Sequence, residues 1–192
     1  KKYPNKFLID AEYNSIQKDI YEISDYAIDN YNTINNKYFY KTLQMYRNDV
    51  WDIYNNDINN FMKNNKYALK LVRGAYIYTD SKYILSCKED TDSQYNKAVY
   101  EYFLNLNQFP NNELVIATHN RNSYKLAREH LDRLNNNNNV YFATLLGMAD
   151  EICYDNTKNK LKYVPYGPFL ETTPYLLRRL IENKDVLKHI NL

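Results

Sequence analysis

Short apolar runs recur along the chain. The longer stretches between them carry apolar residues at helical spacing. Each run is continuous in apolar residues and bounded by polar turns, which is typical of a buried strand. The clear runs are ALKLV (68–72), ELVIA (113–117), VYFATLL (140–146) and LKYVPY (161–166), and the weaker ones are KFLIDA (6–11) and YFYKTLQMY (38–46). The clearest helical stretch is SYKLAREHLDRL (123–134), whose apolar positions follow a period near 3.6.

Strands that alternate with helices predict an α/β fold with a parallel sheet and crossover helices. Polar residues at the strand ends favour a (βα)8 barrel of the TIM type over a doubly wound sheet. Such a barrel needs eight strands and about 250 residues, or about 200 at the least. The chain has 192 residues, six predicted strands and Lys1 in place of a starting Met. We therefore expect a single domain, 1–192, that covers about strands 3 to 8 and the last helix, with the first strands upstream.

The segment YLLRRLIEN (175–183) predicts an amphipathic helix with an unusual polar side. At about 100° per residue, the apolar arc holds Leu176, Leu177, Leu180 and Ile181, and the opposite arc holds Tyr175, Arg178, Arg179 and Glu182. Thr173 as N-cap and Pro174 as first helical residue would place the helix start just before this arc. Two guanidiniums near a helix start predict a receptor for an anion. The alternative is a solvated amphipathic face.

The predicted strand ends carry the other candidate residues, because the loops that follow the strands form the mouth of such a barrel. In chain order they are Asp10 and Glu12, Gln44, Arg73 to Tyr76, Thr118 to Asn120, Leu145 to Met148, and Tyr163 to Gly167. Amide, guanidinium, imidazole and phenol groups with few carboxylates suit a polyanionic cofactor better than metal-assisted hydrolysis. Arg73 precedes Gly74, whose missing side chain permits close backbone approach. His119 is either a structural histidine or a cofactor contact, and its place at a strand end favours the contact.

Composition excludes several classes of function. A net charge of +2 provides no basic patch for nucleic acid. Cys87 and Cys153 lack the spacing of a metal site and favour a reducing compartment, so we expect no metal. No apolar stretch is long enough to cross a membrane. The 22 Tyr residues fit an AT-rich genome, which lowers the weight of any single Tyr.

Seven ordered motifs closely resemble the proline dehydrogenase family, whose members are flavin enzymes with a (βα)8 barrel. They are LIDAE (8–12), TLQMY (42–46), KLVRGAY (70–76), ATHN (117–120), LLGMAD (145–150), YVPYG (163–167) and YLLRRLIEN (175–183). Together they cover nearly the whole chain.

The resemblance implies a role for each matching residue. Arg178 and Arg179 correspond to the arginines that hold the proline carboxylate, and the residues that line the substrate pocket correspond to Asp10, Tyr76, Leu145, Tyr163 and Tyr175. The positions that meet the flavin ring correspond to Gln44 and Lys70. The positions along the ribityl, diphosphate and adenosine parts of the cofactor correspond to Arg73, Thr118, His119, Asn120 and Glu182, and Gly74 lies beside Arg73 in the sequence.

The chain departs from the family pattern at three places. Lys70 stands where bacterial members often carry Arg, and Ile77 where some carry Trp, both in the manner of eukaryotic members. The family's lysine on the first strand has no counterpart here, which fits the expected position of those strands upstream.

The resemblance implies FAD-dependent oxidation of L-proline to Δ1-pyrroline-5-carboxylate, with electrons passed to a quinone. The alternatives are another flavin barrel, such as a methylenetetrahydrofolate reductase, and a non-catalytic truncated barrel. A eukaryotic member would lie in the mitochondrion, at the inner membrane or on the matrix side, and any other in the cytoplasm or in peripheral contact with a membrane. The irregular segment 79–94, which leaves directly from Tyr76, predicts a lid over the site, with an inert surface insert as the alternative.

Overall fold

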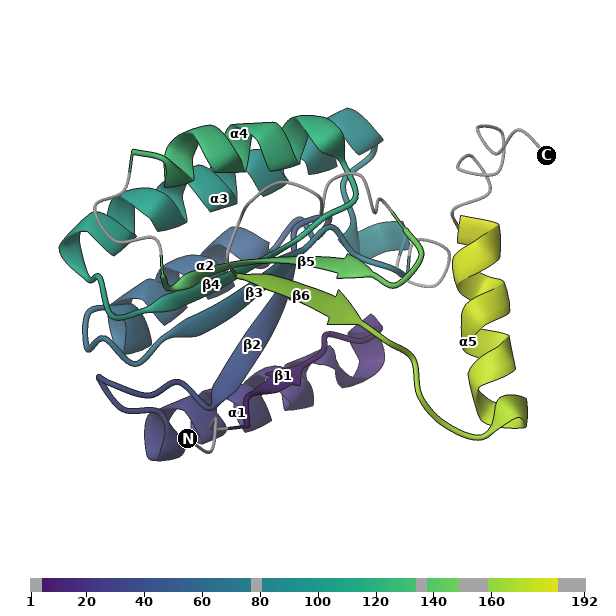
Figure 1. Cartoon of the computed structure of the whole chain (residues 1–192), viewed down its shortest axis with the longest axis horizontal. Helices are drawn as coiled ribbons and strands as arrows, with labels where there is room; N and C mark the ends of the chain where they lie inside the picture. The colour runs from purple at the N-terminus through teal and green to yellow at the C-terminus, as the bar shows by residue number, and fades with distance from the viewer. Residues whose placement is uncertain (1–4, 77–80, 134–137, 149–158, 183–192) are drawn as a thin grey trace. The chain divides into compact units, whose positions relative to one another are not determined.

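The computed structural model describes residues 5–76, 81–133, 138–148 and 159–182, in which strands and helices alternate (Figure 1). The strands are β1 (Phe7–Ile9), β2 (Phe39–Gln44), β3 (Ala68–Val72), β4 (Glu113–Ala117), β5 (Val140–Leu145) and β6 (Lys160–Tyr163). The α-helices are α1 (Asn14–Tyr31), α2 (Val50–Asp57), α3 (Lys88–Gln108), α4 (Arg121–Leu131) and α5 (Phe169–Glu182). A π-helical segment, η1 (Ile58–Met62), extends α2, and a short 3-10 helix, η2 (Ser81–Tyr83), precedes α3.

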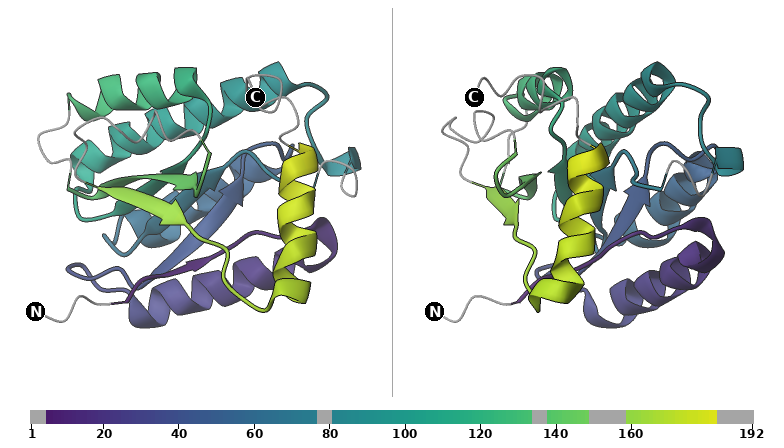
Figure 2. Two further views of the ribbon diagram at one scale, coloured as in Figure 1. Left: turned by 45° about the vertical axis from the view of Figure 1, so that its right-hand side comes forward. Right: turned by 90° about the vertical axis from the view of Figure 1, so that its right-hand side faces the viewer.

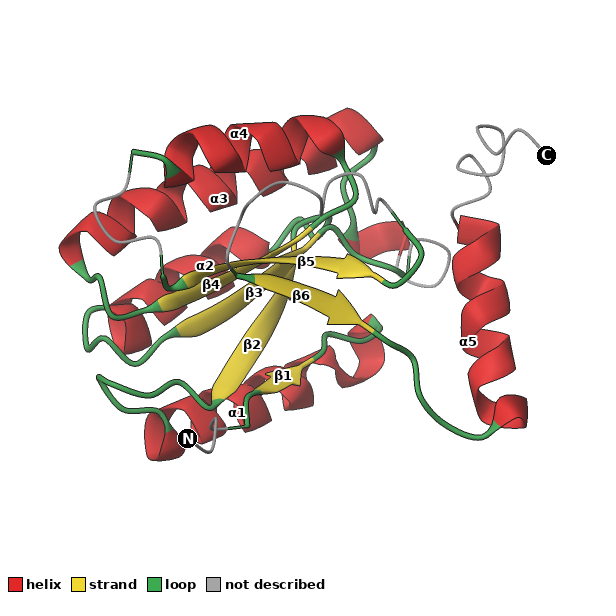
Figure 3. Cartoon of the chain, in the orientation of Figure 1, coloured by secondary structure: helices red, strands yellow, loops and turns green. Residues whose placement is uncertain are grey.

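The strands form one sheet in which they follow the order of the sequence, β1 to β6 (Figure 3). The pairs from β1/β2 to β4/β5 are parallel, and the register places Thr42 beside Lys70 and Leu71 beside Ile116. The strands predicted from the six apolar runs are all present, and their centres agree with the prediction. A parallel sheet that curls in sequence order, with helices between the strands, confirms the expected part of a (βα)8 barrel.

Side chains alternate between the two faces of the sheet, as the pleat requires. The outer face packs against helices α1 to α4, which lie outside the curl (Figures 1 and 2). Leu43, Leu71 and Ile116 belong to this outer core, together with Tyr54, Tyr95 and Tyr102 from the helices. The residues of the inner face are Tyr40, Ala68 and Val115, with Leu8, Tyr141, Ala143 and Leu161 against them. Tyrosine thus supplies much of the core volume on both faces.

The prediction that segment 79–94 is irregular is wrong over most of its length. Residues 79 and 80 lie outside the described ranges. Residues 81–83 form η2, Ile84 makes an antiparallel bridge to Arg47, and α3 begins at Lys88. Cys87 caps this helix because its sulfur accepts the Asp90 N–H at 3.4 Å. Within residues 88–94 the buried position is Thr91, a polar residue, so the sequence of these first turns shows no apolar residues at helical spacing. Residues 88–94 thus belong to a helix that packs on the core, and the lid stays a prediction for the residues before Lys88.

The chain divides into two compact units, Lys1–Lys162 and Tyr163–Leu192. In the second unit, the predicted start of the last helix is wrong: α5 begins at Phe169, and Pro174 lies inside it. The carbonyl of Pro168 accepts the N–H groups of Glu171 and Thr172 at 3.0 Å, and the Thr173 hydroxyl donates to the Phe169 carbonyl at 2.6 Å. A helical turn is therefore complete before the proline.

This earlier start changes the setting of the two arginines on α5. Arg178 and Arg179 lie about three turns beyond Phe169. The helix dipole acts mainly within the first turn. The expectation that the arginines lie at a helix N-terminus is therefore wrong, and the helix dipole would not help to bind an anion there. Within the described ranges, no helix has both the length and the apolar content needed to span a bilayer.

Candidate active site

An ion pair links the end of β1 to the middle of β3 on the inner side of the curl. The Lys70 ammonium donates a hydrogen bond to the carboxylate of Asp10, which follows β1 directly. Thr42 on β2 lies beside Lys70 in the register, and its side chain is buried. Among the described residues, the Thr42 hydroxyl has no hydrogen-bond partner. Sequence reasoning missed Thr42, although it shares a strand face with the predicted Gln44.

The loop after β1 is fixed by a second group of hydrogen bonds. The buried amide of Gln44 donates to the Glu12 carbonyl at 2.8 Å and to Gln17 Oε1 at 3.3 Å. The Glu12 N–H donates to Gln17 Oε1 at 2.7 Å, and the Glu12 carboxylate accepts the hydroxyl of Tyr76. The ring of Tyr13 packs edge-on against that of Tyr76. Glu12 therefore connects the ends of β1, β2 and β3.

Arg73 crosses from the end of β3 to the start of α4. Its Nη1 donates to Thr118 Oγ1 at 2.8 Å, its Nη2 to Ser123 Oγ at 2.7 Å, and its Nε to Asp92 Oδ1 at 2.5 Å. The guanidinium carbon lies 4.4 Å from the centre of the Tyr95 ring. Three of its five N–H groups are used in these bonds, so two are left for a ligand as far as the described residues go.

The charges around Arg73 shift two pKa values. Burial raises the pKa of Asp92, but the hydrogen bonds from Arg73 and Lys88 outweigh it, so the pKa lies below the ordinary value of an aspartate. Burial raises the pKa of Tyr95, against a smaller opposing effect of the Arg73 charge. Asp92 is therefore a carboxylate, and Tyr95 a neutral phenol, at neutral pH.

The residues after β4 form the N-terminus of α4. Asn120 is the N-cap, since its side-chain oxygen accepts the Ser123 N–H at 3.1 Å. Thr118 Oγ1 also accepts the Asn120 N–H at 3.1 Å. His119 Nε2 accepts the backbone N–H of Leu145 at 3.0 Å, which joins the ends of β4 and β5. A helix N-terminus beside a guanidinium is a ready anion receptor.

Gly74 has a structural reason to be glycine. Its φ is +133°, and a Cβ at this position would lie 2.2 Å from Cδ1 of Tyr46. The Tyr46 backbone is held on both sides, because its N–H donates to the Arg73 carbonyl and its carbonyl accepts the Leu85 N–H, each at 2.8 Å. We expected the missing side chain to let a cofactor approach the Gly74 backbone. In this structure the Tyr46 ring occupies the space beside Gly74.

The predicted site residues of the first unit gather at one edge of the sheet. At or just beyond the carboxyl ends of β1 to β5 lie Asp10, Gln44, Arg73, Gly74, Tyr76, Thr118, His119, Asn120 and Leu145, and Lys70 lies two residues before the end of β3. Tyr163 ends β6, and α5 carries Tyr175, Arg178, Arg179 and Glu182, whose side chains lie outside the described part of the structure. Within the described residues, no group of three His, Cys, Asp or Glu side chains could hold a metal ion.

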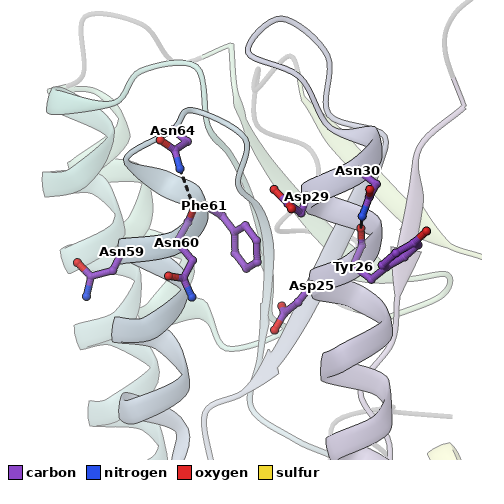
Figure 4. A pocket seen from close by; sticks show the side chains of 8 residues that line it. All are labelled: Asp25, Tyr26, Asp29, Asn30, Asn59, Asn60, Phe61 and Asn64. Carbon is purple, nitrogen blue, oxygen red and sulfur yellow. Dashed lines mark hydrogen bonds between the residues drawn. The ribbon is translucent and has the colours of Figure 1, made fainter.

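A groove of about 530 Å³ lies outside the curl, between α1 and η1 (Figure 4). Its lining residues are Asp25, Tyr26, Asp29, Asn30, Asn59, Asn60, Phe61 and Asn64. Two of its amides are bonded to their own helices, Asn30 to the Tyr26 carbonyl and Asn64 to the Asn60 carbonyl. The groove adjoins the end of α1, from which the chain enters β2, so it lies away from the carboxyl ends of the strands.

A curled parallel sheet with polar and cationic side chains at its carboxyl edge defines the class as the barrel enzymes that bind their ligands at the mouth of a (βα)8 fold. Within this class, the sequence matches the proline dehydrogenase family over residues 1–191. The chain belongs to the proline dehydrogenase family.

Individual relatives agree with this assignment. Mitochondrial proline dehydrogenase 1 of Dictyostelium discoideum is 34% identical over 201 residues, and the match covers 94% of this chain and 35% of that protein. Mitochondrial proline dehydrogenase 1 of Homo sapiens is 28% identical, over 95% of this chain and 33% of that protein. The chain thus spans about a third of the length of these relatives.

The fold recurs in a solved structure of proline utilization A from Bdellovibrio bacteriovorus. The TM-score is 0.81 at 23% identity, and the match covers 92% of this chain and 20% of that one. This similarity supports the barrel architecture.

Proposed function

We propose that the full-length protein oxidises L-proline to Δ1-pyrroline-5-carboxylate, with FAD as its cofactor and a quinone as the final electron acceptor. The observation that carries the proposal is the convergence of Arg73, Thr118 and Asn120 at the start of α4. These residues match the family positions along the dinucleotide part of the cofactor. Their arrangement, a guanidinium beside a helix N-terminus, suits a diphosphate.

The donor set fits FAD in its other parts as well. Lys70 and Gln44, on neighbouring strands, match the positions that meet the flavin ring, while His119 and Glu182 match positions along the rest of the cofactor. Bound flavin would supply the acceptor for a hydride. Lys70 is paired with Asp10, so the inner side of the site keeps a balanced charge until a ligand enters.

The chain's own residues would bind and orient the substrate. Arg178 and Arg179 supply two cations for the proline carboxylate, and a guanidinium can hold a carboxylate with two parallel hydrogen bonds. The other pocket residues are Asp10, Tyr76, Leu145, Tyr163 and Tyr175, of which the three tyrosine rings and the Leu145 side chain would exclude water from the reacting carbon. Removal of hydride from a secondary amine depends on such positioning, and none of these side chains has to act as a nucleophile.

The names of the relatives support a location for the protein. Several of them are named as mitochondrial proteins, among them those of Dictyostelium discoideum, Arabidopsis thaliana and Homo sapiens. If the source is eukaryotic, we place this protein in the mitochondrion, and transfer of electrons to a quinone would bring it to the inner membrane surface.

Replacement of Arg73 by Ala tests the cofactor site. The full-length Arg73→Ala protein should purify with much less bound FAD than the wild type, measured by flavin absorbance per polypeptide. Arg128→Ala is the matched control, because Arg128 lies in the second half of α4 and pairs with Asp132 at 3.4 Å. Full flavin occupancy in Arg73→Ala would leave Arg73 a structural role only.

A further inference from the structure

Asp92 on α3 has the shortest hydrogen bond to the guanidinium of Arg73. Its Oδ1 accepts the Arg73 Nε–H at 2.5 Å, and its Oδ2 accepts from Lys88 one turn earlier at 3.1 Å. The side chains of Arg73 and Asp92 are mostly buried, with 21% and 24% exposure. Nothing in the family motifs of the sequence includes Asp92.

The other contacts of Arg73 are weaker in kind. Thr118 and Ser123 offer neutral hydroxyls, and Tyr95 offers the face of its ring. A hydrogen bond between two ions is roughly twice as strong as one to a neutral group. An arginine side chain also has several rotatable bonds to immobilise. Asp92 is therefore the main anchor of the guanidinium.

We propose that Asp92 is a positioning residue for the cofactor diphosphate: it holds Arg73 over the Tyr95 ring so that the remaining N–H groups face the start of α4. The inference rests on the proposed binding of FAD. Asp92 binds Arg73 on the Nε side and leaves the donors beside the α4 N-terminus for the ligand.

Loss of the Asp92 charge and loss of its hydrogen bond should change the affinity for FAD in opposite directions. Removal of a carboxylate near an anion site makes the site more positive, which by itself would tighten binding of the anion. Loss of the anchor frees the arginine, which weakens binding. Asp92→Asn and Asp92→Ala remove the same charge, but only Asn keeps an oxygen that can accept from Nε. The difference between the two variants therefore excludes the effect of the charge and reports the side chain that can accept the hydrogen bond.

The experiment measures dissociation constants of FAD and of riboflavin, by quenching of flavin fluorescence, in the flavin-depleted full-length protein. Riboflavin carries the same ring system without phosphate. In Asp92→Ala we expect the FAD constant to rise by about 10-fold, and the riboflavin constant to stay within about twofold. Asp92→Asn should fall between Asp92→Ala and the wild type for FAD. The matched control is Asp90→Asn, which removes a charge two residues away on the same helix, from a residue that is exposed.

Each outcome decides the inference. FAD binding in Asp92→Ala that equals or exceeds that of the wild type would overturn it. The loss of the negative charge would then outweigh the loss of Arg73 orientation. Weakening of FAD and riboflavin by the same factor would also overturn it, since that result indicates a general loss of structure. If the wild type binds neither flavin, the proposed function fails and the inference fails with it, whereas normal wild-type binding with an unaffected Asp92→Ala refutes the inference alone.

Discussion

Replacement of Gly74 by Ala should destabilise the protein through two separate effects. The first is backbone strain, because a φ of +133° is one that L-residues rarely adopt, and such strain costs about 1–3 kcal/mol. The second is a collision, since the new Cβ would lie 2.2, 2.3 and 2.6 Å from three atoms of the Tyr46 ring. Overpacking of this kind costs about 1–3 kcal/mol.

Tyr46 has little freedom to move away. It is buried, and its backbone is bonded to Arg73 on one side and Leu85 on the other. We therefore expect Gly74→Ala to lower the free energy of unfolding by about 2–6 kcal/mol. Gly147→Ala is a matched control, because Gly147 has a φ of +78° with no atom within 4 Å of its added Cβ. It should show only the backbone cost, about 1–2 kcal/mol.

The assay is urea unfolding of the flavin-free, full-length variants, followed by circular dichroism. Flavin-free protein is essential, because the reasoning assigns the cost to Tyr46 and not to the cofactor. If Gly74→Ala and Gly147→Ala have the same unfolding midpoint, the Tyr46 ring does not fill the space beside Gly74. If the two differ only when FAD is bound, the cofactor and not the ring explains the glycine.

Three further predictions follow from other groups. Asp57→Asn should lower the free energy of unfolding by about 3 kcal/mol, because it leaves the buried ammonium of Lys41, 2.9 Å from Asp57 in the native protein, with one carboxylate in place of two; an unchanged urea midpoint would refute this. Replacing Arg178 or Arg179 by Met should raise the KM for proline by about 10- to 150-fold, and a KM within about twofold in both variants would mean that the carboxylate binds elsewhere. The pKa of Asp92 is lowered in the folded state, so its contribution to stability is complete above its ordinary pKa near 3.9 and is lost as the pH falls through the lower folded value. Acid titrations of wild type and Asp92→Asn, followed by circular dichroism, should therefore differ most in stability at neutral pH and converge as the pH falls below the ordinary pKa of an aspartate.

The strands could be predicted from the sequence because buried parallel strands are continuous apolar runs with polar borders. Leu71 and Ile116, neighbours in the register, both came from such runs. The first turns of α3, residues 88–94, could not, because their buried position is the polar Thr91 and the next buried residue is Tyr95. In a chain so rich in Tyr, this residue serves as core material, and hydropathy alone does not identify it.

The site was predictable where a motif marks the end of a strand. Arg73, Thr118 and Asn120 were expected from their positions, and the structure brings them together. Asp92 and Ser123 were not expected, because they reach the guanidinium of Arg73 from helices whose registers only the fold defines. The start of α5 was misplaced because Pro174 fits the first turn of a helix so well that it was taken as the boundary.

Anaerobic addition of L-proline to the FAD-loaded, full-length protein tests the central claim most directly. The account predicts that the absorption band of the oxidised flavin bleaches with L-proline and that one Δ1-pyrroline-5-carboxylate forms for each flavin reduced. A flavin band that L-proline leaves unchanged, while a chemical reductant such as dithionite still bleaches it, would contradict the account.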